Sequence, residues 1–107
     1  AKARRSYDTG PMAVAIVEVQ KSSQKIPAIE QTYSAGAVCL ALLNAALALG
    51  WGANWLSGWP SHDREFATKA FRLSENERIA GVIYIGTETS RPPERPRPNL
   101  HDIVTWL

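Results

Sequence analysis

The chain has 107 residues, which is enough for one domain at most. Its formal net charge is only +2, so a basic surface for nucleic acid is not favoured. The single cysteine excludes an intramolecular disulfide and a cysteine-rich metal site. We interpret Cys39 as a small buried hydrophobic side chain, and His62 and His101 as separate surface residues.

A strand and a long helix are the first elements that the sequence predicts. Residues 1–11 are polar and basic, and no signal peptide pattern follows them. Met12–Val19 is a continuous apolar run rich in Val and Ile, which is typical of a strand covered on both faces. A polar loop at residues 20–27 leads to a helix from about Ala28 to Leu49. Gly50 then takes the natural position just past the helix end.

The centre of the chain carries no formal charge. No Asp, Glu, Lys, Arg or His occurs in residues 31–61, although charged residues make up 21% of the chain. A helix without a charged face must be hidden from water, inside a core or at a subunit interface. The run is long enough to span a bilayer, but Gly50 and Gly52 break it and Asn44 would need a partner in lipid. We therefore predict a buried helix and no membrane span.

The second half of the chain predicts two strands, a short helix and a tail. A short strand is expected at Gly52–Trp55, followed by an amphipathic helix at residues 62–71 with Ser61 as its N-cap. Ile79–Ile85 has the pattern of a third buried strand. Residues 88–99 contain four prolines and three arginines, which predicts an extended tail. This order of strands and helices indicates an α/β fold, and its uncovered apolar faces indicate a missing segment, a partner subunit or both.

Three segments in this order resemble the flavin-dependent nitroreductase family, and within it the YdjA-type branch. Glu30–Val38 is similar to the entry of the family's central helix, Leu47–Gly58 to its flavin-facing strand and loop, and Arg78–Thr87 to its final core strand. The resemblance covers nearly all of this chain but only the C-terminal half of the family. The family's opening Arg-Ser-x-Arg segment binds FMN, and Arg4–Tyr7 resembles it only superficially. We interpret that tetrapeptide as a solvated basic end.

The resemblance implies a fold and an activity. The fold would be α+β and nitroreductase-like, with a central sheet flanked by helices, a long buried dimer-interface helix and an extended C-terminal tail. Residues 1–107 would be the C-terminal part of a single domain that also needs an N-terminal segment. The activity would be that of a cytoplasmic, homodimeric FMN-dependent NAD(P)H oxidoreductase acting on nitroaromatic or quinone-like acceptors. The alternative is a non-catalytic half-domain that dimerises but does not hold FMN alone.

The resemblance also assigns cofactor contacts, but no catalytic side chain and no metal, because the flavin performs the redox step. Trp55, Leu56 and Ser57 match the family's FMN-contacting triplet, and a flavin needs an apolar wall, a close backbone and a hydrogen-bonding group. Relatives often have Arg in place of Leu56, so that charged contact is absent here. Gly50 ends a stretch, residues 45–50, that matches nicotinamide-nucleotide contacts in relatives. The alternatives are a core aromatic at Trp55 and a packing role for residues 45–50.

The tail offers a candidate site for the FMN phosphate. Arg95 and Arg97 resemble the basic pair that some nitroreductases place on this phosphate. Residues two apart on an extended chain point the same way, and the Arg fork suits a phosphate group. A solvated arm is the alternative. Gly86 and Thr87 follow the third strand, where they form either a turn or the edge of a ligand site.

Overall fold

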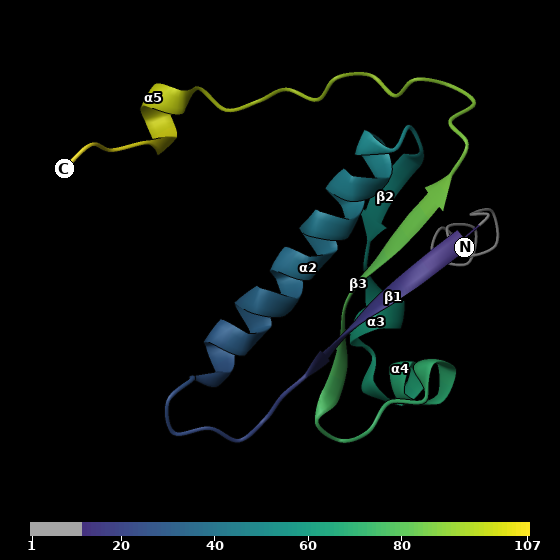
Figure 1. Cartoon of the computed structure of the whole chain (residues 1–107), viewed down its shortest axis with the longest axis vertical. Helices are drawn as coiled ribbons and strands as arrows, with labels where there is room; N and C mark the ends of the chain where they lie inside the picture. The colour runs from purple at the N-terminus through teal and green to yellow at the C-terminus, as the bar shows by residue number, and fades with distance from the viewer. Residues whose placement is uncertain (1–11) are drawn as a thin grey trace.

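The computed structural model describes residues 12–107 as a small sheet with helices on both faces (Figure 1). Any role of Arg4–Tyr7 therefore lies outside the described residues. In chain order the elements are β1 (Met12–Val19), α2 (Ala28–Ala48), β2 (Gly52–Leu56), α3 (Trp59–His62), α4 (Arg64–Phe71), β3 (Glu77–Gly86) and α5 (Leu100–Ile103).

The last strand of the chain lies in the middle of the sheet. The strand order is β1-β3-β2, and β3 pairs antiparallel with both neighbours. Ile83 is the clearest marker of the register, because it lies opposite Val14 on one side and Trp55 on the other. Val82 and Ile83 are fully buried, as expected for a central strand. The antiparallel pairing gives the α+β arrangement that the family resemblance implies.

One face of the sheet forms a compact core with α4. The buried residues of this core are Ala67, Leu73, Ile79 and Val82. Tyr84 of β3 and Ala15 of β1 pack against them, which places even-numbered β3 positions near Val82 on this face. The amphipathic pattern of α4 explains this packing, because its Ala67 and Phe71 are four residues apart and lie on one side of the helix.

Helix α2 covers the other face of the sheet (Figure 1). It ends as the sequence predicts, because Gly50 has φ +90° and its N–H donates to the Leu47 carbonyl at 3.0 Å. Only Cys39 and Ala46 of α2 are fully buried in the single chain. Asn44 is exposed, although burial was expected for it. The predicted burial of α2 is therefore confirmed only on the side that packs on the sheet. Burial of its other side by a partner stays a prediction.

Strand β1 is less covered than its apolar sequence predicts. Met12 and Val19 are exposed, and Glu18 is the strand residue that is fully buried. The prediction of cover on both faces is wrong for the described chain. The physical reason is the strand order among residues 12–107, where β1 lies at the edge of the sheet and pairs with β3 alone.

The connection after β2 also differs from the sequence prediction. A short helix, α3, comes first, and α4 starts only at Arg64 with Asp63 as its N-cap. The Asp63 carboxylate accepts a hydrogen bond from the Phe66 N–H at 2.9 Å, so Ser61 is not the cap. Pro60 accounts for the extra turn, because proline is favoured in the first turn of a helix.

The C-terminal segment is extended, as predicted. Residues 87–99 contain no helix or strand and are exposed throughout. Figure 1 shows this segment leaving the end of β3 and passing over the C-terminal end of α2 to reach α5. The apolar residues at its end, Leu100, Ile103 and Trp106, are exposed in the single chain.

Candidate functional site

The exit of β2 presents the predicted triplet. Strand alternation places Trp55 on the α2 side of the sheet and Leu56 on the opposite side, next to Val82. Ser57 is exposed just past the strand end. Gly58 follows with φ +94°, a conformation that favours glycine, and turns the chain into α3. The triplet thus divides, with Trp55 and Ser57 open to solvent and Leu56 half-buried.

The Trp55 indole lies against the central strand. A Cβ atom placed on Gly81 of β3 would lie 2.3 Å from Trp55 Nε1 and 2.9 Å from Trp55 Cδ1. The ring therefore occupies the space that a side chain at position 81 would fill. Trp55 still keeps 38% of its surface exposed, so its ring is only partly buried within the described chain.

Gly50 lies at the other end of β2. Trp51 and the five residues of β2 separate it from Ser57, and β2 alone corresponds to about 16 Å of extended chain. Gly50 is exposed, and it stands beside Trp51 at the mouth of a separate cavity. The structure does not bring Gly50 together with the triplet.

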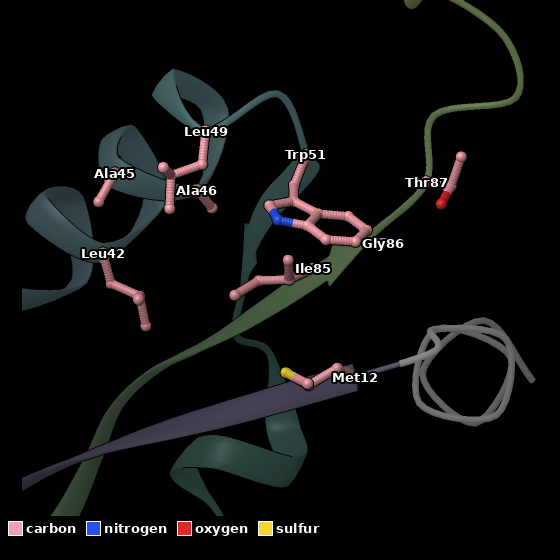
Figure 2. Close-up of a pocket in the computed structure, with 9 residues that line it drawn as sticks. All are labelled: Met12, Leu42, Ala45, Ala46, Leu49, Trp51, Ile85, Gly86 and Thr87. Atoms are coloured by element: carbon pink, nitrogen blue, oxygen red, sulfur yellow. The ribbon is translucent and has the colours of Figure 1, made fainter.

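That cavity is apolar and has a volume of about 610 Å³. It lies between the C-terminal end of α2 and the sheet, and Figure 2 shows Leu42 and Leu49 on one side and Trp51 over Ile85 on the other. Met12 closes it from β1, and Ala45, Ala46, Gly86 and Thr87 complete the lining. No lining residue is charged, so these walls fit an apolar body or an aromatic ring but not a phosphate.

The two arginines of the tail stand apart from the triplet. Arg95 and Arg97 are exposed, and Arg97 Nη2 is 2.7 Å from the Glu94 carboxylate. Figure 1 shows the tail leaving the end of β3 and running toward α5, whereas β2 leads into α3 at the other end of the sheet. A phosphate bound by this pair would therefore not belong to a ligand that sits at the β2 exit of the same chain.

A polar cluster around the buried Glu18 joins β1, β3 and the N-terminal part of α2. The Glu18 carboxylate accepts hydrogen bonds from Arg78 and Thr32, and from Gln20 Nε2 at 2.8 Å. Arg78 Nη2 also donates to Thr32 Oγ1 at 2.9 Å. The hydrogen bond from Arg78 is the main cause that lowers the pKa of Glu18 to about 2. The sequence analysis did not single out this cluster, although one acidic residue inside an apolar strand was a signal for it.

No group of three or more His, Cys, Asp and Glu side chains could hold a metal ion within residues 12–107. Helix α2 is long and apolar enough to cross a bilayer by length and composition alone, but core helices of soluble proteins pass the same test.

Comparisons with known proteins identify the family of the chain. The model of the Nitroreductase family matches residues 1–87. The chain is 34% identical over 86 residues to "Putative NAD(P)H nitroreductase YdjA" of Escherichia coli K12, which covers 80% of this chain and 46% of that protein. It is 30% identical over 109 residues to a "Putative NAD(P)H nitroreductase" of Haemophilus influenzae, covering 99% of this chain and 58% of that protein.

A solved structure shares the fold. The nitroreductase-like family protein of Bacillus cereus superposes with a TM-score of 0.79 and 19% identity, over 99% of this chain and 59% of that one. The chain thus spans about half the length of the curated relatives it matches. The family match covers most of the sequence, and the sheet, the long helix and the tail recur in a solved relative. The chain therefore belongs to the nitroreductase family.

Proposed function

We propose that this chain is part of an FMN-dependent NAD(P)H oxidoreductase of nitroreductase type. The observation that carries the proposal is the exit of β2, where a half-exposed Trp55, an exposed Ser57 and the turn at Gly58 follow one another in a member of this family. The relatives in Escherichia coli and Haemophilus influenzae are named as NAD(P)H nitroreductases, which supports the same activity.

The residues present fit the flavin ring. Trp55 would supply an apolar wall, and the Ser57 hydroxyl can donate or accept a hydrogen bond at the ring edge. A Cβ added at Gly58 would meet only Pro60 Cδ at 3.8 Å, so the backbone there is open to close approach. When bound, FMN would supply the redox chemistry between NAD(P)H and a nitroaromatic or quinone-like acceptor. The chain's own residues bind and orient, and none is required to react.

The phosphate of FMN needs cations that the β2 exit does not provide. We assign this role to Arg95 and Arg97, because the tail is extended and both guanidinium groups are exposed. Since these residues stand apart from Trp55 in their own chain, they would reach a flavin bound at the β2 exit of a second copy. The cofactor site is then shared between two protomers.

A homodimer would also cover the apolar surface of α2. Tyr33, Val38, Leu40 and Leu47 are between 49% and 68% exposed in the single chain. Burial of such side chains is worth about 25 cal/mol per Å² of apolar surface, which favours a partner over water. We further propose that the rest of the domain in this protein completes the site, and that the enzyme works in the cytoplasm, where NAD(P)H is available.

Purification of the full-length protein tests the proposal directly. We expect a yellow protein, or one that binds added FMN, and NAD(P)H oxidation that depends on a nitroaromatic or quinone acceptor. Ser57→Ala and the double variant Arg95→Ala/Arg97→Ala should each raise the FMN dissociation constant, by about tenfold or more for the arginine pair. Lys69→Ala on α4 is the control and should bind FMN as the wild type does. A colourless full-length protein that binds no added FMN would contradict the proposal.

A half-domain that dimerises without holding FMN is the second candidate. It is favoured by the separation of the tail arginines from the β2 exit within the described chain. FMN titration of the 107-residue chain alone distinguishes the two. Micromolar binding would count against the half-domain, and absence of binding combined with dimerisation would support it for this chain.

A further inference from the structure

Gly81 lies beside a register shift in β3, because Ile16 pairs with Gly81 and Val17 pairs with Ile79. It lies in the middle of β3, the central strand of the sheet, and it is buried. Glycine in a strand interior lowers stability, because it gains more freedom on unfolding and has no side chain to pack. Among the glycines of residues 12–107, positive φ values occur at Gly50 and Gly58, so the backbone conformation at Gly81 does not demand glycine.

The requirement for glycine comes from one neighbouring side chain. The three atoms nearest to a Cβ at position 81 are Nε1, Cδ1 and Cε2 of Trp55, at 2.3, 2.9 and 3.0 Å. All three belong to a rigid indole ring, which cannot bend away locally. The ring would have to retreat by about 1 Å before its contact with this methyl group became ordinary. At Gly36 of α2, by contrast, an added Cβ meets nothing within 4 Å.

We propose that Gly81 is a positioning residue for the flavin site, acting through Trp55. The missing side chain lets the indole lie against β3, and this sets how much room remains on the exposed side of the indole for an isoalloxazine ring. The inference rests on the proposed function, because it assigns Trp55 as a wall of the flavin site. In this inference Gly81 would not touch the flavin, but it would set the position of Trp55, which would.

Displacement of the indole should have a measurable effect on bound flavin. An indole that moves outward by about 1 Å would enter the space of a flavin ring stacked on it. A displacement of this size is large for a preorganised binding site. A tryptophan beside an isoalloxazine also quenches the fluorescence of the flavin by electron transfer, and this quenching falls steeply with distance. Fluorescence of the bound flavin therefore reports the position of Trp55 independently of protein stability.

The experiment uses the full-length protein in five forms. They are the wild type, Gly81→Ala, Trp55→Leu, the double variant Gly81→Ala/Trp55→Leu, and the control Gly36→Ala. The measurements are the FMN dissociation constant, the fluorescence of bound FMN and the melting temperature. For Gly81→Ala we expect a dissociation constant raised about tenfold and weaker quenching than in the wild type. Gly36→Ala should match the wild type in both flavin measurements.

The double variant decides whether Gly81 acts through Trp55. Once leucine replaces the indole, the methyl group at position 81 has no ring to displace, so the double variant should match Trp55→Leu in affinity and fluorescence. This comparison decides even where Gly81→Ala alone does not fold. A double variant that differs from Trp55→Leu in bound-flavin fluorescence would overturn the inference.

Other outcomes separate this inference from the proposed function. If the wild type binds FMN and Gly81→Ala has the same FMN affinity and flavin fluorescence, the positioning role is rejected. The proposed flavoenzyme function is unaffected by that result. Full quenching retained in Trp55→Leu would show that Trp55 does not face the flavin, and would also reject the positioning role. Failure of the wild type and Gly36→Ala to bind FMN at all would remove the proposed function and the inference with it. A lower melting temperature of Gly81→Ala with unchanged flavin fluorescence would mean a purely structural role.

Discussion

Glu18 and Cys39 are the two buried residues of this chain whose chemistry depends most on their surroundings. Glu18 is 4% exposed, and it accepts hydrogen bonds from Arg78, Thr32 and Gln20. A buried carboxylate is costly unless it is paired, and here each donor comes from a different part of the chain. Cys39 is a residue of α2 itself, and its side chain is completely buried. Both residues can be tested separately.

Glu18→Gln should lower the free energy of unfolding by about 2 kcal/mol at neutral pH, because it removes the charge that Arg78 and Thr32 bind. The pKa of Glu18 is lowered from 4.5 to about 2 in the folded chain. Its contribution is therefore fully present above pH 4.5 and is lost as the pH falls from there toward 2. Chemical denaturation at several pH values should show this acid loss in the wild type and a flatter profile in Glu18→Gln. Glu65→Gln is the control, because Glu65 is exposed and pairs only with Lys69.

Cys39 should be unreactive toward thiol reagents in the native protein. Burial raises the pKa of the Cys39 thiol, so little of the reactive thiolate is present, and the side chain has no exposed surface. Mass spectrometry after treatment with a maleimide should find no label at neutral pH and one label per chain in denaturant. Rapid labelling of the folded protein would contradict the packing of α2 on the sheet.

The elements differ in how far the sequence alone could predict them. The ends of β1 and the start of α2 agree with the sequence prediction, because a Val-rich run and a loop bounded by Pro27 mark them locally. The N-cap predicted for α4, Ser61, was wrong by two residues. Ser61 and Asp63 both belong to residue types that cap helices well, and only the extended backbone at Asp63 decides between them. Nothing local marks the strand order β1-β3-β2, because paired residues are 58 to 73 positions apart between β1 and β3 and 26 to 34 positions apart between β2 and β3.

The same limits apply to the candidate site. Trp55 and Ser57 were assigned from the family resemblance, and both are exposed in the described chain. Their contact with Gly81, and the cluster around Glu18, join segments far apart in the chain and so left little trace in the sequence. The convergence of Arg95, Arg97 and Gly50 with the triplet stays a prediction, because it would depend on a second copy.

Replacement of the true cap tests the element boundary. Asp63→Ala should cost about 1 kcal/mol, because the Phe66 N–H loses its acceptor at the start of α4. Ser61→Ala should change the stability by less than about 0.5 kcal/mol, since the buried Ser61 hydroxyl makes no hydrogen bond within the described chain. Thermal or urea unfolding of both variants gives the comparison. A larger loss for Ser61→Ala than for Asp63→Ala would restore Ser61 as the cap.

At the scale of the whole molecule, the exposed side of α2 and the apolar end of the tail are apolar surfaces that no other part of the described chain covers. Leu40 is 50% exposed on α2, and Trp106 is 90% exposed after α5. A monomer in water would not keep so much apolar surface without cost. The proposed homodimer removes this cost and places the tail of one protomer near the β2 exit of the other.

Leu40→Glu should therefore dissociate the homodimer and weaken FMN binding in the same protein. A charge on an exposed helix face costs a monomer little, whereas an unpaired charge buried in an interface costs several kcal/mol. Sedimentation velocity and FMN titration should change together. Lys69→Glu, on the exposed side of α4, should leave both unchanged. An unaltered dimer in Leu40→Glu would place the interface elsewhere.

The central position of β3 has a consequence for synthesis of the protein. The ribosome releases β1 and β2 before β3, and among residues 12–107 both pair only with β3, so this pairing waits until residues 77–86 have emerged. Within this part of the chain β1 waits for β3 through most of the time needed to translate the region, and unpaired strands invite aggregation. The speed of translation after Leu56, and access of chaperones to Met12–Val19 in that interval, should therefore set how much of the protein reaches its native form.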